Sequence, residues 1–224
     1  NNFYMIKNYT NNIGIVIQAR MNSKRLPGKV TKNFLGEPLI IYKINLIRKL
    51  GVNLPIIVAM SDNKSDDGLA KLCEQKNVNY FRGPEENVFK RFKLLLYDRS
   101  FETIVRLTAD NPLTKLDYLI EGINLHQKFN SDITTTRKID LNNQVISFVP
   151  KGLSFDIIKA KHIIDADIES LNDFEKEHII PYFFNKNFNV SYVKDDSINA
   201  SFTIDTINEF QNVEKYCKKL IDDN

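Results

Sequence analysis

The sequence predicts an α/β fold with a mostly parallel sheet flanked by helices. Apolar runs of strand length recur along the first half of the chain, at residues 13–17, 56–60, 79–81 and 103–107. Stretches with helical spacing of apolar residues separate them, so strand and helix alternate. This alternation is typical of parallel strands joined by crossover helices that cover both faces of a sheet.

Each helix of the first half is predicted from its apolar spacing. The first covers 39–50 and follows Pro38, a favourable first-turn residue. The second covers 66–76, and the third spans about 88–96. The second half is mixed. Strands are expected at 132–136, 145–149, 190–193 and 201–204, and helices at 155–165, 174–184 and 208–220. The polar residues 139–143 lie between two expected strands and are the candidate for a protruding arm.

Composition and charge limit the class of protein. The 224 residues are 42% hydrophobic and 26% charged, as in ordinary soluble globular proteins. A net charge of +3 is too small to indicate nucleic acid or a membrane surface as partner, so neither is expected. No apolar run approaches the ~20 residues that a membrane helix needs. Cys73 and Cys217 match no metal spacing and are too few for a disulfide framework, so we expect a cytoplasmic protein with reduced thiols.

The segment after the first strand, QARMNSKRLPGK at residues 18–29, is the strongest functional signal. Between residues 18 and 36 there is no acidic residue, and there are five basic ones: Arg20, Lys24, Arg25, Lys29 and Lys32. In α/β sheets ligands bind at the carboxyl ends of strands. Arginine and lysine there match phosphate oxygens. The alternative is a basic loop that only keeps the surface soluble.

Two common phosphate-binding motifs do not match this cationic segment. A P-loop needs glycine five residues before the Gly-Lys pair and Ser or Thr after it, but these positions hold Ser23 and Val30. A dinucleotide fingerprint needs three spaced glycines, and only Gly14 lies on the strand side. Phosphate would therefore be bound mainly by side chains.

The cationic segment resembles the first signature of the cytidylyltransferases that activate acidic sugars. It is most similar to the branch named for the spore-coat polysaccharide biosynthesis protein F, and more distantly to CMP-Kdo and CMP-sialic acid synthetases. Five further segments resemble that family in order, at 59–62, 81–88, 106–112, 176–182 and 203–206. Asn22 replaces the usual glycine, and asparagine tolerates a left-handed backbone. Ser154 replaces an acid. The resemblance implies a Rossmann-like fold of the nucleotide-diphospho-sugar transferase type.

Two carboxylates are candidates for a metal site. Asp110 and Asp205 each follow an expected strand, where side chains converge above a sheet. Singly, each could be a cap of a turn or helix. Together with the cationic segment they favour Mg²⁺, which takes one or two carboxylates plus phosphate oxygens. The sequence Asp165-Ala166-Asp167 matches a glycosyltransferase metal motif, but it ends a helical stretch and is not expected to bind metal.

The resemblance also implies roles for single residues. The catalytic residues would be Arg20, Lys29 and Asp110. Nucleotide binding would use Gln18, Ala19, Arg20, Ser23, Arg25, Lys29, Ser61, Arg82 and Thr108. The sugar would contact Lys151, Asp156, Lys176 and His178. For His178 a structural hydrogen bond is an equal alternative.

We therefore expect one domain over residues 1–224. Its parts would be a nucleotide-binding half (11–130), a sugar-binding and dimerisation part (131–200), and a return strand with a C-terminal helix (201–224). The expected enzyme transfers CMP from CTP to an acidic sugar, which gives a CMP-sugar and releases pyrophosphate, and it is expected to form a homodimer. The alternatives are a glycosyltransferase that consumes a nucleotide-sugar and a non-catalytic nucleotide-binding module.

Overall fold

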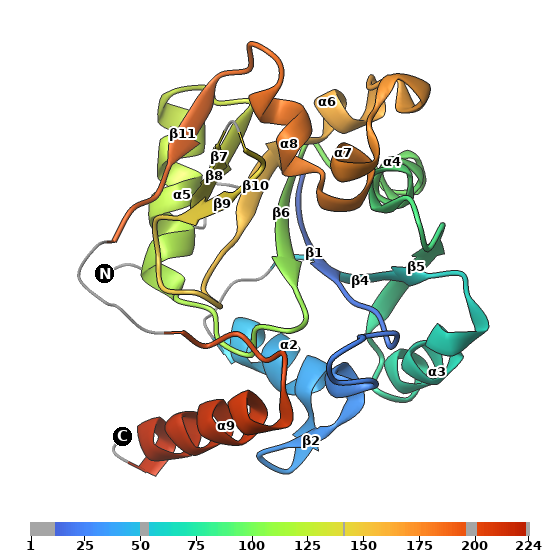
Figure 1. Ribbon diagram of the computed structural model, residues 1–224, viewed down its shortest axis with the longest axis vertical. Coiled ribbons are helices and arrows are strands. Elements are labelled where there is room, and N and C mark those ends of the chain that lie inside the picture. The colour runs from blue at the N-terminus through green and yellow to red at the C-terminus, as the bar shows by residue number, and fades with distance from the viewer. Residues whose placement is uncertain (1–11, 50–53, 141, 196–200, 223–224) are drawn as a thin grey trace.

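A seven-stranded sheet forms the centre of the protein (Figure 1). The computed structural model describes residues 12–49, 54–140, 142–195 and 201–222. The strand order is β11-β7-β10-β6-β1-β4-β5. The strands are β1 (Ile13–Gln18), β4 (Ile56–Ser61), β5 (Asn79–Gly83), β6 (Thr103–Thr108), β7 (Ile133–Thr135), β10 (Asp156–Lys159) and β11 (Val190–Tyr192). Only β10 is antiparallel to its neighbours, so the predicted mostly parallel sheet is confirmed.

Helices cover both faces of the sheet. Alternate strand residues point to opposite sides, so the continuous apolar runs of the strands leave apolar side chains on both faces. Ile15 and Ile17 of β1 belong to one buried cluster, and Val16 between them belongs to the other. The first face is covered by α2 (Leu39–Lys49), α3 (Asp67–Gln75) and α5 (Leu116–Lys128). The second is covered by α4 (Val88–Asp98), α6 (Ala160–Ile164) and α8 (Ile180–Phe184), with α7 (Asp173–His178) beside α4. The sequence analysis did not predict α5.

The C-terminal helix α9 (Ile207–Asp222) packs outside the main sheet (Figure 1). Its Phe210 lies in a third buried cluster with Phe34 and Leu39, close to the hairpin of β2 (Asn33–Phe34) and β3 (Glu37–Pro38). A second hairpin pairs β8 (Arg137–Ile139) with β9 (Val145–Ser147). Of the candidate arm at 139–143, residue 139 ends β8, residues 140, 142 and 143 lie in the connection, and residue 141 lies outside the described residues. Short 3₁₀ turns lie at Lys29–Thr31, Lys64–Asp66 and Ile168–Ser170. No helix within the described ranges is long and apolar enough to cross a membrane.

The predicted helix at 155–165 is wrong in its first half, which forms strand β10. β10 lies between β6 and β7, and its residues Asp156–Ile158 are buried. A strand buried on both faces shows no polar-apolar alternation, so its apolar run resembles a helix segment. Only the end of the predicted range is helical, as α6.

Two other elements of the structure also differ from the sequence prediction. Residues 201–204 are extended, but they form only an isolated bridge between Ser201 and Lys151, not a return strand. The helix at 174–184 is split into α7 and α8 by Ile179, whose φ is 64°. This backbone is unusual for a β-branched residue and ends the first helix.

Candidate active site

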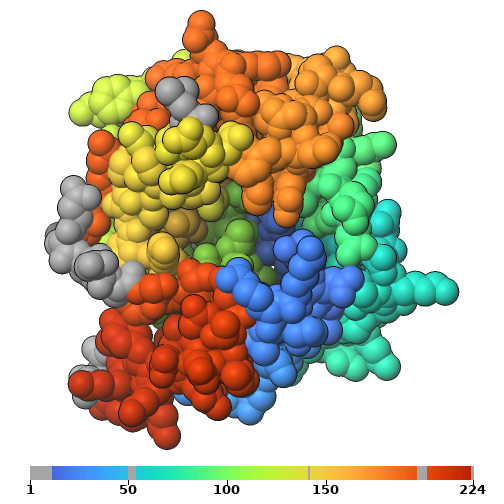
Figure 2. Space-filling model, in the orientation of Figure 1, coloured from blue at the N-terminus to red at the C-terminus, as the bar shows by residue number. Residues whose placement is uncertain are grey.

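A cavity of about 380 Å³ opens beyond the carboxyl ends of β1 and β6. Figure 2 shows a hollow between the blue N-terminal, yellow and orange segments. Six residues of the cationic segment predicted to bind nucleotide line it: Gln18, Ala19, Arg20, Ser23, Arg25 and Lys29. Four other predicted residues also line it, namely Thr108, Asp110, His178 and Asp205. The cavity thus unites most of the predicted site from both halves of the chain.

Backbone hydrogen bonds give the cationic segment a closed turn. The carbonyl oxygen of Met21 accepts from the amides of Ser23 and Gly28, both at 2.9 Å. The left-handed residue of this turn is Gly28, with φ 68°. Asn22 does not have a positive φ, so our explanation of its replacement for glycine by left-handed backbone is wrong.

A buried carboxylate fixes the start of this turn. Asp66 is fully buried and accepts from the amides of Met21 (2.7 Å) and Ser61 (2.8 Å) and from the Ser61 hydroxyl (2.6 Å). It therefore joins the cationic segment to the end of β4. The sequence suggested only a helix start at this position.

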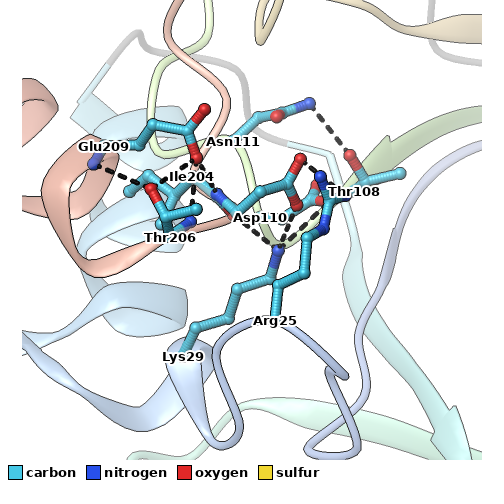
Figure 3. A network of polar contacts seen from close by, with 9 residues as sticks. Arg25, Lys29, Thr108, Asp110, Asn111, Ile204, Thr206 and Glu209 are labelled. Carbon is cyan, nitrogen blue, oxygen red and sulfur yellow. Dashed lines mark hydrogen bonds and ion pairs between the residues drawn. The ribbon is translucent and has the colours of Figure 1, made fainter.

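Asp110 and Asp205, the carboxylate pair, converge on one ammonium group (Figure 3). The Lys29 Nζ lies 3.2 Å from Asp205 Oδ1 and 3.6 Å from Asp110 Oδ2, and it donates to the Ile204 carbonyl at 2.5 Å. Arg25 Nη2 lies 2.8 Å from the other oxygen of Asp205. Two residues that are 95 positions apart in sequence thus share a site.

The extended segment 201–206 brings Asp205 to this position. The Phe202 amide donates to the Lys151 carbonyl at 2.6 Å, and the Ile204 amide donates to the Asp110 carbonyl at 3.1 Å. This approach requires Gly152, because a Cβ there would lie 2.5 Å from the Phe202 carbonyl carbon.

The first turn of α9 also fixes Asp205. Glu209 accepts from the amides of Asp205 at 2.9 Å and Thr206 at 2.8 Å, and its own amide bonds to the Thr206 hydroxyl at 3.2 Å (Figure 3). This reciprocal arrangement is a capping box. Asp205 is therefore held from both sides of the turn.

The donor set of the carboxylate pair fits Mg²⁺. Both ligands are hard oxygen donors, which this ion prefers, and a cationic group already lies between them. In the described residues no group of three or more His, Cys, Asp or Glu could hold a metal ion. A metal here would need further oxygens from water or a phosphate-bearing substrate.

A second charged cluster also borders the cavity. Arg106 and Arg137, the arginine pair, line the cavity and both contact Oδ2 of the fully buried Asp156, at 2.8 and 2.7 Å. Burial alone would raise the pKa of Asp156, but the charges of Arg137 and Arg106 lower it below its ordinary value. Arg106 also donates to the Gln18 side-chain oxygen at 2.7 Å. Asp156 does not itself line the cavity.

His178 is the last residue of α7 and faces the cavity with Glu177. Partial burial lowers the pKa of His178, and the positive charges of Arg106, Arg137 and Arg20 lower it further against the opposing effect of Glu177. The turn at Ile179, directly after it, ends the helix at the cavity wall.

Four other predicted site residues do not line the cavity. The Ser61 hydroxyl is used by Asp66, and Arg82 donates to the carbonyls of Ser61 and Asn63. Lys151 bridges to Ser201, and Lys176 lies outside the lining residues. Asp165 ends α6, as the sequence suggested, and Asp167 caps the following 3₁₀ turn.

Sequence reasoning did not single out two buried cations: Arg91, which lines the cavity, and Lys43, which does not line it. Arg91 is buried and donates to the carbonyls of Pro84 (2.8 Å) and Glu85 (3.0 Å), so it holds the 82–87 segment. Lys43 is buried behind Asp110 and donates to the Asn111 carbonyl at 2.6 Å. Burial lowers the pKa of Lys43 to about 8, against the raising effect of Asp110. For Arg91 and Lys43 alike, the sequence signal that could have revealed them is a single cation among the apolar residues of one helix face.

The parallel sheet, the basic cavity and the convergent carboxylates define a nucleotide-diphospho-sugar transferase type of α/β protein. The cytidylyltransferase family profile matches residues 14–223. The chain therefore belongs to the cytidylyltransferase family, whose members are nucleotidyltransferases.

Similar proteins agree with this family. The spore coat polysaccharide biosynthesis protein SpsF of Bacillus subtilis is 32% identical over 180 residues, which are 78% of this chain and 71% of that protein. The 3-deoxy-manno-octulosonate cytidylyltransferase of Wigglesworthia glossinidia brevipalpis is 26% identical over 195 residues, 81% of this chain and 70% of that one. The structure of a cytidylyltransferase from Leptospira borgpetersenii has a TM-score of 0.80 at 22% identity, covering 93% of this chain and 87% of that one.

Proposed function

We propose that this protein transfers the cytidylyl group of CTP to an acidic sugar, giving a CMP-sugar and pyrophosphate for surface polysaccharide or glycan synthesis. The observation that carries the proposal is the cavity in which the cationic segment meets the carboxylate pair. The acceptor would be an eight- or nine-carbon keto-acid sugar, and the relative named as a 3-deoxy-manno-octulosonate cytidylyltransferase supports the eight-carbon class.

The charge of the cavity supports two anionic substrates. Its lining holds seven lysine and arginine side chains against four carboxylates. Within the described chain, Arg20 makes no ion pair and is available to a phosphate. The arginine pair offers a second positive region, beside Gln18 of the cationic segment, that suits an acidic acceptor.

The residues would act mainly by position and charge. Arg20, Arg25 and Lys29 would bind the phosphates and neutralise the departing pyrophosphate, with Ser23 beside them. Gln18, Ala19 and Thr108 would line the nucleotide side. His178 and the arginine pair would orient the sugar hydroxyl for in-line attack on the α-phosphorus. Asp110 and Asp205 would hold Mg²⁺, which when bound supplies charge stabilisation at the phosphate oxygens.

Pyrophosphate release tests this proposal. We expect release from CTP with Mg²⁺ and an acidic sugar, and a loss of at least about 100-fold for Asp110→Asn and Asp205→Asn. Asp165→Asn is the matched control, because Asp165 is an exposed carboxylate outside the cavity. Full activity of both site variants would remove the metal assignment. Release of free CMP or UDP from a nucleotide-sugar would favour the glycosyltransferase, and CTP binding without turnover a non-catalytic module.

We also propose a cytoplasmic homodimer whose second part, residues 131–200, contacts the partner. The β8–β9 hairpin supports this interface, because Val145 and Ile146 are exposed apolar residues on it. Sedimentation of the protein and of a Val145→Lys/Ile146→Lys variant tests it. A monomer at all concentrations for the unchanged protein would contradict the dimer.

A further inference from the structure

We propose that Lys29 and Arg25 are internal counter-cations of the carboxylate pair. They would hold these oxygens in the free protein and leave them when a triphosphate binds, so that metal and nucleotide bind cooperatively. The inference rests on the proposed function, because it takes Asp110 and Asp205 as the metal ligands.

The positions of the two cations carry the inference. Lys29 Nζ faces one oxygen of Asp205 at 3.2 Å and one of Asp110 at 3.6 Å, and Arg25 Nη2 faces the other oxygen of Asp205 at 2.8 Å. Both oxygens of Asp205 thus face a positive group. The Lys29 side chain is only 8% exposed, so little water screens its charge.

A divalent ion would compete with both cations for the same oxygens. Positive charges at such short distances repel strongly where water is scarce. Two carboxylates are also few ligands for Mg²⁺, which completes its shell with water or phosphate oxygens. We therefore expect the protein without nucleotide to bind a divalent ion weakly.

A triphosphate would relieve this competition. Lys29 and Arg25 both line the cavity, and the Arg25 side chain is 67% exposed and can change partner. Lysine is a mobile point charge, and the arginine fork fits phosphate oxygens. When these groups turn to phosphate, the carboxylates are released to the metal. By linkage, each ligand then increases the affinity for the other by the same factor.

Binding of Mn²⁺ alone, followed by its electron paramagnetic resonance signal into the millimolar range, tests the inference. Without nucleotide we expect Arg25→Gln and Lys29→Met to bind Mn²⁺ about tenfold more tightly than the unchanged protein, within the usual size of such couplings. With a non-reactive methylene analogue of CTP, the unchanged protein should gain affinity and both variants should gain less. Lys24→Met is the matched control. Lys24 lines the same cavity, and no ion pair joins it to either carboxylate in the described chain.

Two results would overturn the inference, and they can be distinguished. If Arg25→Gln and Lys29→Met bind Mn²⁺ no more tightly than the unchanged protein, while Asp110→Asn and Asp205→Asn lose it, the cations do not compete and the metal assignment stands. If both Asn variants bind Mn²⁺ normally, the metal assignment fails and the inference with it. Thermal unfolding of Lys29→Met checks its fold, and the exposed Arg25→Gln keeps the test decisive if Lys29→Met is unstable.

Discussion

The two charged clusters of the cavity contain the same kinds of groups in opposite order of burial. Around Lys29 the cation is buried, at 8% exposure, and the carboxylates of Asp110 and Asp205 are 35% and 21% exposed. Around Asp156 the carboxylate is fully buried, Arg106 is 5% exposed and Arg137 is 20% exposed. The first cluster therefore presents oxygens to a ligand, and the second presents mainly the guanidinium of Arg137.

This difference shows that burial decides which charge a mixed cluster offers. A buried ion needs an opposite charge beside it at all times, because its loss leaves an uncompensated charge in a medium of low polarity. The more exposed member is screened by water and can exchange its partner for a ligand. The Lys29 cluster suits a metal with its phosphates, and the Asp156 cluster suits an anion.

The largest expected effect concerns Asp156. Asp156→Asn should lower the free energy of unfolding by about 3–5 kcal/mol, because Arg106 and Arg137 lose their buried partner. Asp205→Asn should cost about 1 kcal/mol or less, since its ion pair with Arg25 is largely exposed and Lys29 keeps Asp110 and the Ile204 carbonyl as partners. Urea unfolding of both variants measures the difference. An equal loss of unfolding free energy in the two variants would show that burial of the carboxylate does not distinguish the two clusters.

A smaller effect is expected when the approach of segment 201–206 is blocked. Gly152→Ala should reduce turnover about tenfold or more, because a Cβ would push Phe202 away and displace Asp205. Gly36→Ala is the matched control: Gly36 has a similar φ of 92°, but nothing lies within 4 Å of its Cβ position. Both variants carry backbone strain of about 1–3 kcal/mol. Equal turnover in the two would mean that Asp205 tolerates the displacement.

The smallest effect concerns the titration of His178. Burial, followed by the charges of Arg106, Arg137 and Arg20, lowers the pKa of His178 below 6.5, so the neutral ring persists as the pH falls below that value. Arg137→Gln should move this pKa upward, and protonation should begin at higher pH. Arg25→Gln should leave it unchanged, because Arg25 belongs to the other cluster. Proton NMR of the His178 ring follows both titrations. An unchanged pKa in Arg137→Gln would mean that the charge of Arg137 does not affect the titration of His178.

Local sequence patterns were enough to predict the strands and helices whose apolar residues follow the usual spacing. β1, β4, β5 and β6 were predicted because each is a short apolar run between helices, and α2 and α9 because their apolar residues repeat at helical spacing. β10 was missed because a strand buried on both faces has no alternation. The split between α7 and α8 depends on one strained residue, Ile179, that the surrounding pattern does not reveal.

The candidate site was predictable where its residues cluster in sequence. The cationic segment supplies six lining residues, and the carboxylate pair was recognisable at strand ends or turns. Arg137 was not predicted, because it comes from a polar hairpin and meets Asp156 only through the folded sheet. The counter-cation position of Lys29 likewise depends on the approach of Ile204, 175 residues later in the sequence.

The late position of Asp205 has a consequence for synthesis. The sheet strands that support Asp110 precede residue 193, but the second carboxylate arrives with the segment that leads into α9. A nascent chain emerging from the ribosome in N-to-C order does not bring the two carboxylates together until that segment docks on Lys151 and Asp110. If the proposed function holds, catalytic competence is a late event in the maturation of each chain, and incomplete chains do not consume the proposed substrate CTP.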